Sequence, residues 1–160
     1  MPEISLLGWF HTGIAIVALA AGLFSMVRYK FIDPIQMSGK VYLLCTLIAA
    51  ITALMIYQHG KFGPAHGLAV LTLVALVIGF VAAKTTIFGK LSAYLQAASF
   101  TGTFLFHMIP AITDGLMRLP MDSPIVSNIE DPLLKGFYLS FFVIYIVVLS
   151  MQIMTLRKQG

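Results

Sequence analysis

The run PAHGLAVLTLVALVIGFVAA, residues 64–83, contains no charged side chain. As an α-helix rising about 1.5 Å per residue, it is long enough to cross the ~30 Å hydrocarbon core of a bilayer. A helix satisfies its own backbone hydrogen bonds, which a segment surrounded by lipid requires. This stretch therefore predicts a transmembrane helix.

Four further runs have the same character, at residues 4–27, 41–58, 91–113 and 137–156. The chain is 59% hydrophobic and only 10% charged, whereas an ordinary soluble domain has about 25% charged residues. The buried core helices of a soluble protein would not reach these lengths. We expect an all-α, polytopic membrane bundle of five transmembrane helices, forming a single domain over residues 1–160. Because residues 1–3 carry no basic side chain, we expect the first run to persist as a helix and not to be a cleaved signal peptide.

Basic side chains collect on one side of this predicted bundle. If successive helices alternate in direction, seven of the ten Lys and Arg lie on the side opposite the N-terminus, with Asp33 as their one acidic neighbour. Basic residues near helix ends mark the cytoplasmic side, which predicts an outer N-terminus and a cytoplasmic C-terminus in a cell inner membrane. Topology thus explains the net charge of +4, and no nucleic acid is expected as a partner. The seven basic residues are Arg28, Lys30, Lys40, Lys84, Lys90, Arg157 and Lys158.

The longest connection, residues 114–135, lies on the outer side in this topology. It contains three prolines and is too polar to enter the bilayer. Loops of this length are either functional or plain linkers, so it is a lid over an outer site or a linker, and we favour the linker.

All four histidines belong to the outer half of the predicted bundle. His11 lies about 10 Å along the first helix and His107 about 9 Å from the same face, so the two share one level. An ionisable side chain inside a spanning helix is a functional hypothesis by default, although a neutral imidazole also serves to hydrogen-bond a neighbouring helix. His59 and His66 flank the connection between the second and third helices, where they are either ligands or solvated helix-end residues.

Two imidazoles that face each other across a bundle can hold a haem from above and below. His11 and His107 are the candidate axial ligands of a haem b. Its propionates would point to the wet outer edge, where Lys61 and Arg118 are candidate partners.

A stripe of small residues continues from His11 along one face of the first helix, through Ala15, Ala18 and Gly22. Positions four, seven and eleven residues apart share a helix face. Such a stripe either lets another helix approach closely or leaves room for a flat cofactor.

A transition-metal ion, copper or zinc, is the alternative cofactor, since imidazole and carboxylate groups both bind such ions. Neighbouring methionines at positions 55 and 108 would favour cuprous copper, although methionine usually serves in packing. The candidate ligands are His11, His59, His66, His107 and Asp114.

A third possibility is a quinone or lipid site lined by aromatic side chains. Aromatic residues near a membrane boundary are also expected as an interfacial belt. Hydrolytic chemistry is not favoured, because the sequence has no nucleophile-elbow motif, no paired carboxylates at catalytic spacing, no CxxC and no phosphate-binding loop. The aromatic candidates are Trp9, Phe10, Phe104 and Phe106.

Three stretches carry a resemblance to known proteins: GWFHTGIAIVALAAG (8–22), GKVYLLCTLIAAITAL (39–54) and FGPAHGLAVLTL (62–73). They resemble a group of small bacterial predicted membrane proteins of unknown function. In that group a histidine opens the first helix, a glycine and a tyrosine open the second, and an HG step opens the third. The family often has a further histidine just before the second helix, where this chain has Gln36, Met37 and Ser38.

The arrangement also resembles the bis-histidine membrane cytochromes of the b type. Those proteins commonly place haems toward both faces. Since the cytoplasmic half has no histidine, this resemblance implies at most one haem, on the outer side.

The leading expectation is therefore an outer-leaflet histidine site that binds haem b or a transition metal, for electron transfer or metal handling. A protein of this kind is a redox or binding protein rather than a hydrolase or transferase. The rival expectation is a structural or assembly subunit without its own cofactor, which packs through Gly and Ala faces into a larger membrane complex or a homo-oligomer.

Overall fold

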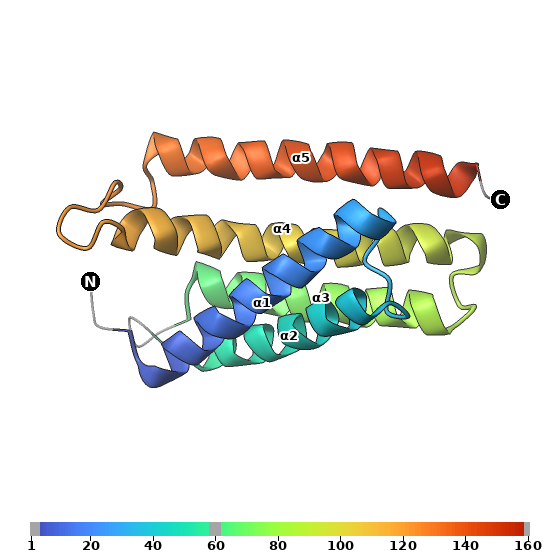
Figure 1. Ribbon diagram of the computed structural model, residues 1–160, viewed down its shortest axis with the longest axis horizontal. Helices are drawn as coiled ribbons and strands as arrows, with labels where there is room; N and C mark the ends of the chain where they lie inside the picture. The colour runs from blue at the N-terminus through green and yellow to red at the C-terminus, as the bar shows by residue number, and fades with distance from the viewer. Residues whose placement is uncertain (1–3, 58–61, 159–160) are drawn as a thin grey trace.

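The computed structural model describes residues 4–57 and 62–158, and over these residues the chain is helical with no β-strand. The expected all-α class is thereby confirmed for the described part of the chain. Figure 1 shows the helices running along the long axis of the molecule. They are α1 (Leu6–Tyr29), α2 (Met37–Met55), α3 (Pro64–Lys84), α4 (Ser92–Arg118) and α5 (Pro132–Arg157), with a short 3-10 helix, η1 (Gly89–Leu91), before α4. The candidate residues His59 and Lys61 lie outside the described residues.

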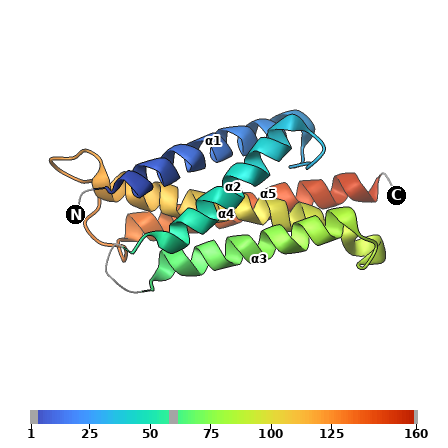
Figure 2. The same ribbon diagram turned by 90° about the horizontal axis from the view of Figure 1, so that it is seen from below.

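The connections gather at two ends of the bundle (Figures 1 and 2). One end has the links 30–36 and 85–91 together with the end of α5, and it carries the seven basic residues identified above. We call it the basic end. The opposite end has the start of α1 and the link from α4 to α5, and we call it the histidine end because His11, His66 and His107 lie in the half of the helices nearest to it.

Four helices are long and apolar enough to cross a membrane, namely α1, α2, α3 and α5. The chain is accordingly a membrane protein. The remaining predicted span corresponds to α4. It is the most polar of the five, with Gln96, Thr101, Thr103 and His107 along its length. It lies between α5 on one side and the other helices on the other (Figure 1), so its polar groups face protein.

The two helices joined by the connection at residues 114–135 are both longer than the sequence pattern predicts. The expected boundaries 113 and 137 are wrong, because α4 continues to Arg118 and α5 begins at Pro132. Asp114 and Arg118 pair at 3.5 Å one turn apart, which stabilises the added turn of α4. Asp131 caps α5 by accepting the Leu133 N–H at 2.8 Å, and Pro132 occupies the first helical position, where its missing N–H costs nothing.

The link between α1 and α2 is a tight turn that lets α2 begin at Met37, ahead of the expected residue 41. Asp33 accepts the Ile35 N–H at 2.8 Å within this turn. Gly39 then packs against the Asp33 backbone so closely that a Cβ at this position would lie 1.9 Å from the Asp33 carbonyl oxygen. A side chain at position 39 is therefore incompatible with the turn.

Glycines also set the distance between neighbouring helices. A Cβ at Gly22 on α1 would lie 2.6 Å from the ring of Tyr42 on α2, and a Cβ at Gly79 on α3 would lie 2.3 Å from the ring of Phe100 on α4. Tyr42 and Phe100 are fully buried, and they form the core together with Ala18 and neighbouring apolar residues. The small-residue stripe of α1 thus serves close helix packing, and the Tyr42 ring occupies the space that a flat cofactor would need.

The last helix, α5, packs chiefly on α4 and lies at the edge of the bundle (Figures 1 and 2). Only Leu134 and Gln152 of this helix are buried. The Gln152 carboxamide donates to the Lys30 carbonyl at 2.8 Å and accepts from the Thr101 hydroxyl at 3.0 Å. One side chain of α5 therefore connects it to both α4 and the end of α1.

Gly79→Ala tests the close packing of α3 on α4. The new methyl group has to displace the buried Phe100 ring, so we expect a loss of about 1–3 kcal/mol in the free energy of unfolding, measured by thermal unfolding of the detergent-solubilised protein. Gly67→Ala on the same helix is the matched control, since a Cβ there meets nothing within 4 Å. It should leave stability unchanged or raise it by up to about 1 kcal/mol. Equal effects of the two substitutions would contradict the assignment.

Candidate functional site

His11 on α1 hydrogen-bonds to α2 through one ring nitrogen, with Nδ1 3.0 Å from the Thr52 hydroxyl oxygen. That hydroxyl donates its hydrogen to backbone carbonyls of its own helix, Ile48 at 2.9 Å and Ala49 at 3.0 Å. With its hydrogen directed to these carbonyls, the Thr52 hydroxyl accepts from His11, an arrangement that favours the imidazole hydrogen on Nδ1. In the neutral ring, Nε2 then carries a free lone pair.

His107 on α4 also bonds to α2, with Nε2 3.1 Å from the hydroxyl oxygen of the fully buried Thr46. Its ring meets the edge of the Tyr42 ring, with 6.3 Å between centroids. The Thr46 hydroxyl can either donate or accept, so both neutral tautomers of His107 satisfy this contact. In either tautomer Nδ1 is the nitrogen that Thr46 leaves free.

The two imidazoles meet α2 at different depths. Thr46 and Thr52 are six residues apart, which separates them by about 9 Å along α2 and about 120° around it. The cause is the direction of the helices that carry the histidines: α1 and α4 are antiparallel, and side chains lean toward the N-terminus of their own helix. His11 therefore leans toward the histidine end and His107 toward the basic end. The predicted shared level is not kept, since His11 lies five residues from the start of α1 and His107 eleven residues from the end of α4.

Tyr42 extends the polar face of α2 toward α4. Its hydroxyl lies 2.7 Å from the Thr103 hydroxyl, which in turn donates to the Phe100 carbonyl at 2.7 Å, so Tyr42 is the donor. Together with Thr46 and Thr52, it gives α2 three polar side chains that bond to neighbouring helices. Thr46 and Thr52 were not predicted from the sequence, and Tyr42 entered only as the tyrosine that opens the second helix in the family resemblance. The signal was available, because polar side chains in an apolar run need protein partners inside a bilayer.

His66 in the first turn of α3 is a buried cap, and the expectation of a solvated residue is wrong. Its side chain is 4% exposed and lies between the rings of Tyr57 and Phe62, at 4.6 and 4.9 Å between centroids. Nδ1 accepts the Gly63 N–H at 3.1 Å, so in the neutral ring the hydrogen is on Nε2. That buried N–H finds no partner among residues 4–57 and 62–158. A protonated nitrogen is not a metal ligand, which argues against His66 in a metal site.

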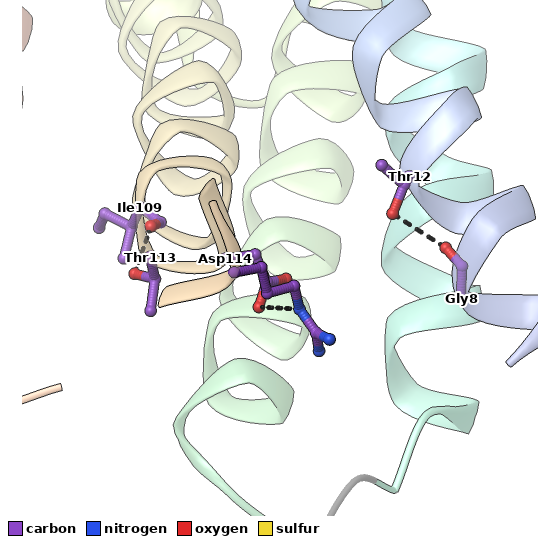
Figure 3. Close-up of polar contacts among 6 residues, drawn as sticks. Gly8, Thr12, Ile109, Thr113 and Asp114 are labelled. Carbon is purple, nitrogen blue, oxygen red and sulfur yellow. Dashed lines mark hydrogen bonds and ion pairs between the residues drawn. The ribbon is translucent and has the colours of Figure 1, made fainter. Parts of the chain in front are cut away.

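Asp114 and Arg118 pair with each other at the end of α4. Figure 3 shows Asp114 on the side of α4 that faces α1 in this view, while Thr113 on the opposite flank donates to the Ile109 carbonyl at 2.7 Å. Asp114 acts electrostatically on His11, in agreement with this placement. Arg118, the predicted propionate partner, thus has a carboxylate neighbour within the chain.

The remaining candidates do not come together into one site. Among the described residues, no three His, Cys, Asp or Glu side chains form a group that could hold a metal ion. The aromatic candidates separate as well: Trp9 and Phe10 are exposed on α1, as in an interfacial belt, whereas Phe104 packs inside against Tyr42 at 6.3 Å between ring centroids. The structure therefore reduces the candidate site to His11, His107 and the hydroxyl groups of α2.

The sequence matches no protein-family model, and comparison with curated proteins and with solved structures gives no match either. The resemblances described for the sequence therefore stay expectations. The functional argument rests on the residues of this chain.

Tyr42→Phe tests the hydrogen bond from α2 to Thr103. It keeps the ring that fills the space over Gly22 and removes only the hydroxyl. Hydrogen bonds between membrane helices contribute about 0.6 kcal/mol on average and at most about 1.7 kcal/mol, so we expect a stability loss in this range. The control is Tyr57→Phe, because the Tyr57 side chain is exposed. Thermal unfolding of both variants in detergent measures the difference, and equal midpoints would refute the contribution of the buried bond.

Proposed function

We propose that this protein crosses a cell inner membrane five times, with an outer N-terminus, and that the His11 and His107 pair binds a transition-metal ion for metal handling or electron transfer. Two parts of the proposal are independent, the topology and the cofactor. Each is supported by different residues and is tested separately.

The five-span topology is supported by the length and surroundings of α4. Its 27 residues reach about 40 Å at ~1.5 Å per residue, which exceeds the thickness of the hydrocarbon core. Its polar groups bond to protein, such as Thr101 to Gln152 and Thr103 to Tyr42, and so avoid lipid. The basic residues collected at one end favour a cytoplasmic location for that end.

Single introduced cysteines test this topology, starting from Cys45→Ala, which removes the native thiol. Thr86→Cys and Ser127→Cys lie in exposed links at the two ends of α4, the first between α3 and α4 and the second between α4 and α5. A membrane-impermeant maleimide applied to intact cells should label Ser127→Cys, whereas Thr86→Cys should react only after lysis. Labelling of both sites in intact cells would show that α4 does not cross the membrane. The reverse pattern would overturn the orientation.

The observation that carries the cofactor proposal is the Thr52 contact, which favours the His11 tautomer with a free Nε2. Metal-binding histidines commonly donate their other ring N–H to a neighbouring group, which orients the ring and raises its basicity. His107 has Nδ1 free of its Thr46 contact, and imidazole nitrogens suit copper, zinc and iron.

Haem b fits this pair less well than a single ion does. Either cofactor needs the two ligating nitrogens within about 4 Å of each other, for metal–nitrogen bonds of ~2.0 Å, and a haem also needs room for its flat ring. The imidazole rings lean toward different levels of α2, so they have to swing toward each other to share one ion. The Tyr42 ring fills the space over Gly22, where a porphyrin edge would need room. This lack of space disfavours the haem relative to the metal ion.

A structural subunit without a cofactor is the second candidate. It is favoured by the observation that both histidines already hydrogen-bond to α2, which is a sufficient role for a neutral imidazole in a membrane protein. In this case the interior serves only to hold the bundle together.

Elemental analysis and an absorption spectrum of the purified protein separate these candidates. We expect a stoichiometric transition metal that is lost in both His11→Ala and His107→Ala. The matched control His66→Gln should retain the metal, because His66 presents a protonated nitrogen. A reduced-minus-oxidised absorption band typical of haem b, lost in the same two variants, would identify the cofactor as haem b and not a metal ion. A colourless and metal-free preparation would contradict the cofactor proposal and support the structural subunit.

A further inference from the structure

The basic end of the bundle contains a cavity of about 590 Å³. The link between α1 and α2 forms one wall, and the ends of α3 and α5 and the start of α4 form the others. Segments distant in the sequence thus converge on one opening. Neither the histidine pair nor the topology requires it.

Two lysines line this cavity, Lys30 from the link and Lys84 from the end of α3. The ion pairs found in the described part of the chain, Asp114 with Arg118 and Glu130 with Lys135, are both at the histidine end, so neither lysine is neutralised by a carboxylate. Asp33 also lines the cavity and contributes one negative charge against the two lysines, with one of its carboxylate oxygens accepting the Ile35 N–H at 2.8 Å. The lining therefore has an excess of positive charge.

Lys30 is held in place by an unusual backbone. Its φ of 67° lies in the left-handed region, where glycine is less strained. The Lys30 carbonyl accepts from the Gln152 carboxamide at 2.8 Å, and the hydroxyl of Ser25 donates to the next carbonyl, that of Phe31, at 3.0 Å. Two buried side chains thus fix the segment that brings this lysine to the cavity.

Polar donors supplement the two ammonium groups. Gln36, the N-cap residue of α2, lines the cavity with its carboxamide side chain. The carboxamide of Gln96 lines the opposite wall from α4. These groups donate hydrogen bonds, as the oxygens of a phosphate require.

Exposed apolar side chains surround the same end. Ile35 lines the cavity and is 75% exposed, and Ile87 and Leu91 are exposed on the link before α4. A cavity that combines positive charge with exposed apolar neighbours at the end of a membrane bundle matches the two halves of an anionic phospholipid.

From these observations we infer that the cavity at the basic end binds a phosphate ester, with Lys30 and Lys84 as its charge partners. An anionic phospholipid head group and a soluble phosphate compound share this chemistry, and the experiment below distinguishes the two sources.

The test uses the full chain, purified in detergent and depleted of lipid, with the midpoint of thermal unfolding as readout. A ligand that binds the folded state raises this midpoint. Three additions are compared: dioleoylphosphatidylglycerol, the zwitterionic dioleoylphosphatidylcholine, and inorganic phosphate. We expect phosphatidylglycerol to raise the midpoint and phosphatidylcholine to have little effect. A shift with inorganic phosphate alone would identify a soluble phosphate compound as the source.

The variant for this test is Lys30→Gln combined with Lys84→Gln. Each lost lysine is expected to weaken the apparent lipid affinity by about fivefold. The matched control is Lys40→Gln combined with Lys158→Gln, which removes two charges of the same end outside the cavity and should keep the shift. If the control variant loses as much of the midpoint shift, the effect comes from surface charge in general, and the proposal is overturned. The absence of any shift in the unsubstituted protein, or an equal shift with phosphatidylcholine, would overturn it as well.

Discussion

Tyr42 lies at the centre of the bundle, with its ring over Gly22 of α1 and its hydroxyl donating to Thr103 of α4. One side chain of α2 thus sets the approach of α1 and contributes a hydrogen bond to α4. Because the bilayer core offers no water, a buried hydroxyl without a protein partner would be costly, and this condition fixes the rotation of α2 relative to both neighbours. Thr46 and Thr52 meet the same condition for His107 and His11. The candidate site is therefore built on the contacts that hold the helices in register.

The sequence was sufficient to predict the helices, because uncharged runs of membrane length have few other solutions. It was less informative at their ends. The extension of α4 depends on the pairing of Asp114 with Arg118, and the start of α5 depends on the cap by Asp131. Both are local polar contacts within a segment whose hydropathy predicts a loop. The glycine contacts could be predicted only as a tendency, since a small residue in a sequence does not identify the ring that will pack on it.

The sequence predicts which residues form the candidate site better than it predicts how their side chains are arranged. Counting along the predicted helices places His11 and His107 at similar depths, but the added turn of α4 leaves His107 eleven residues from the end of its helix and His11 five residues from the start of its own. The rings diverge because antiparallel helices tilt their side chains in opposite directions, and the partners on α2 decide where each ring settles. For His66, the burial between Tyr57 and Phe62 depends on how the chain enters α3, which hydropathy does not report.

The peripheral position of α5 has a consequence for how the protein is made. Synthesis proceeds from the N-terminus, so α4 emerges from the ribosome before α5 does. Thr101 and Thr113 on α4 bond to Gln152 and Tyr138, both of which belong to the last helix. The most polar helix of the chain is thus made before part of its hydrogen-bonding partners exist. Only when α5 has been synthesised can it cover α4 and, through Gln152, contact the end of α1.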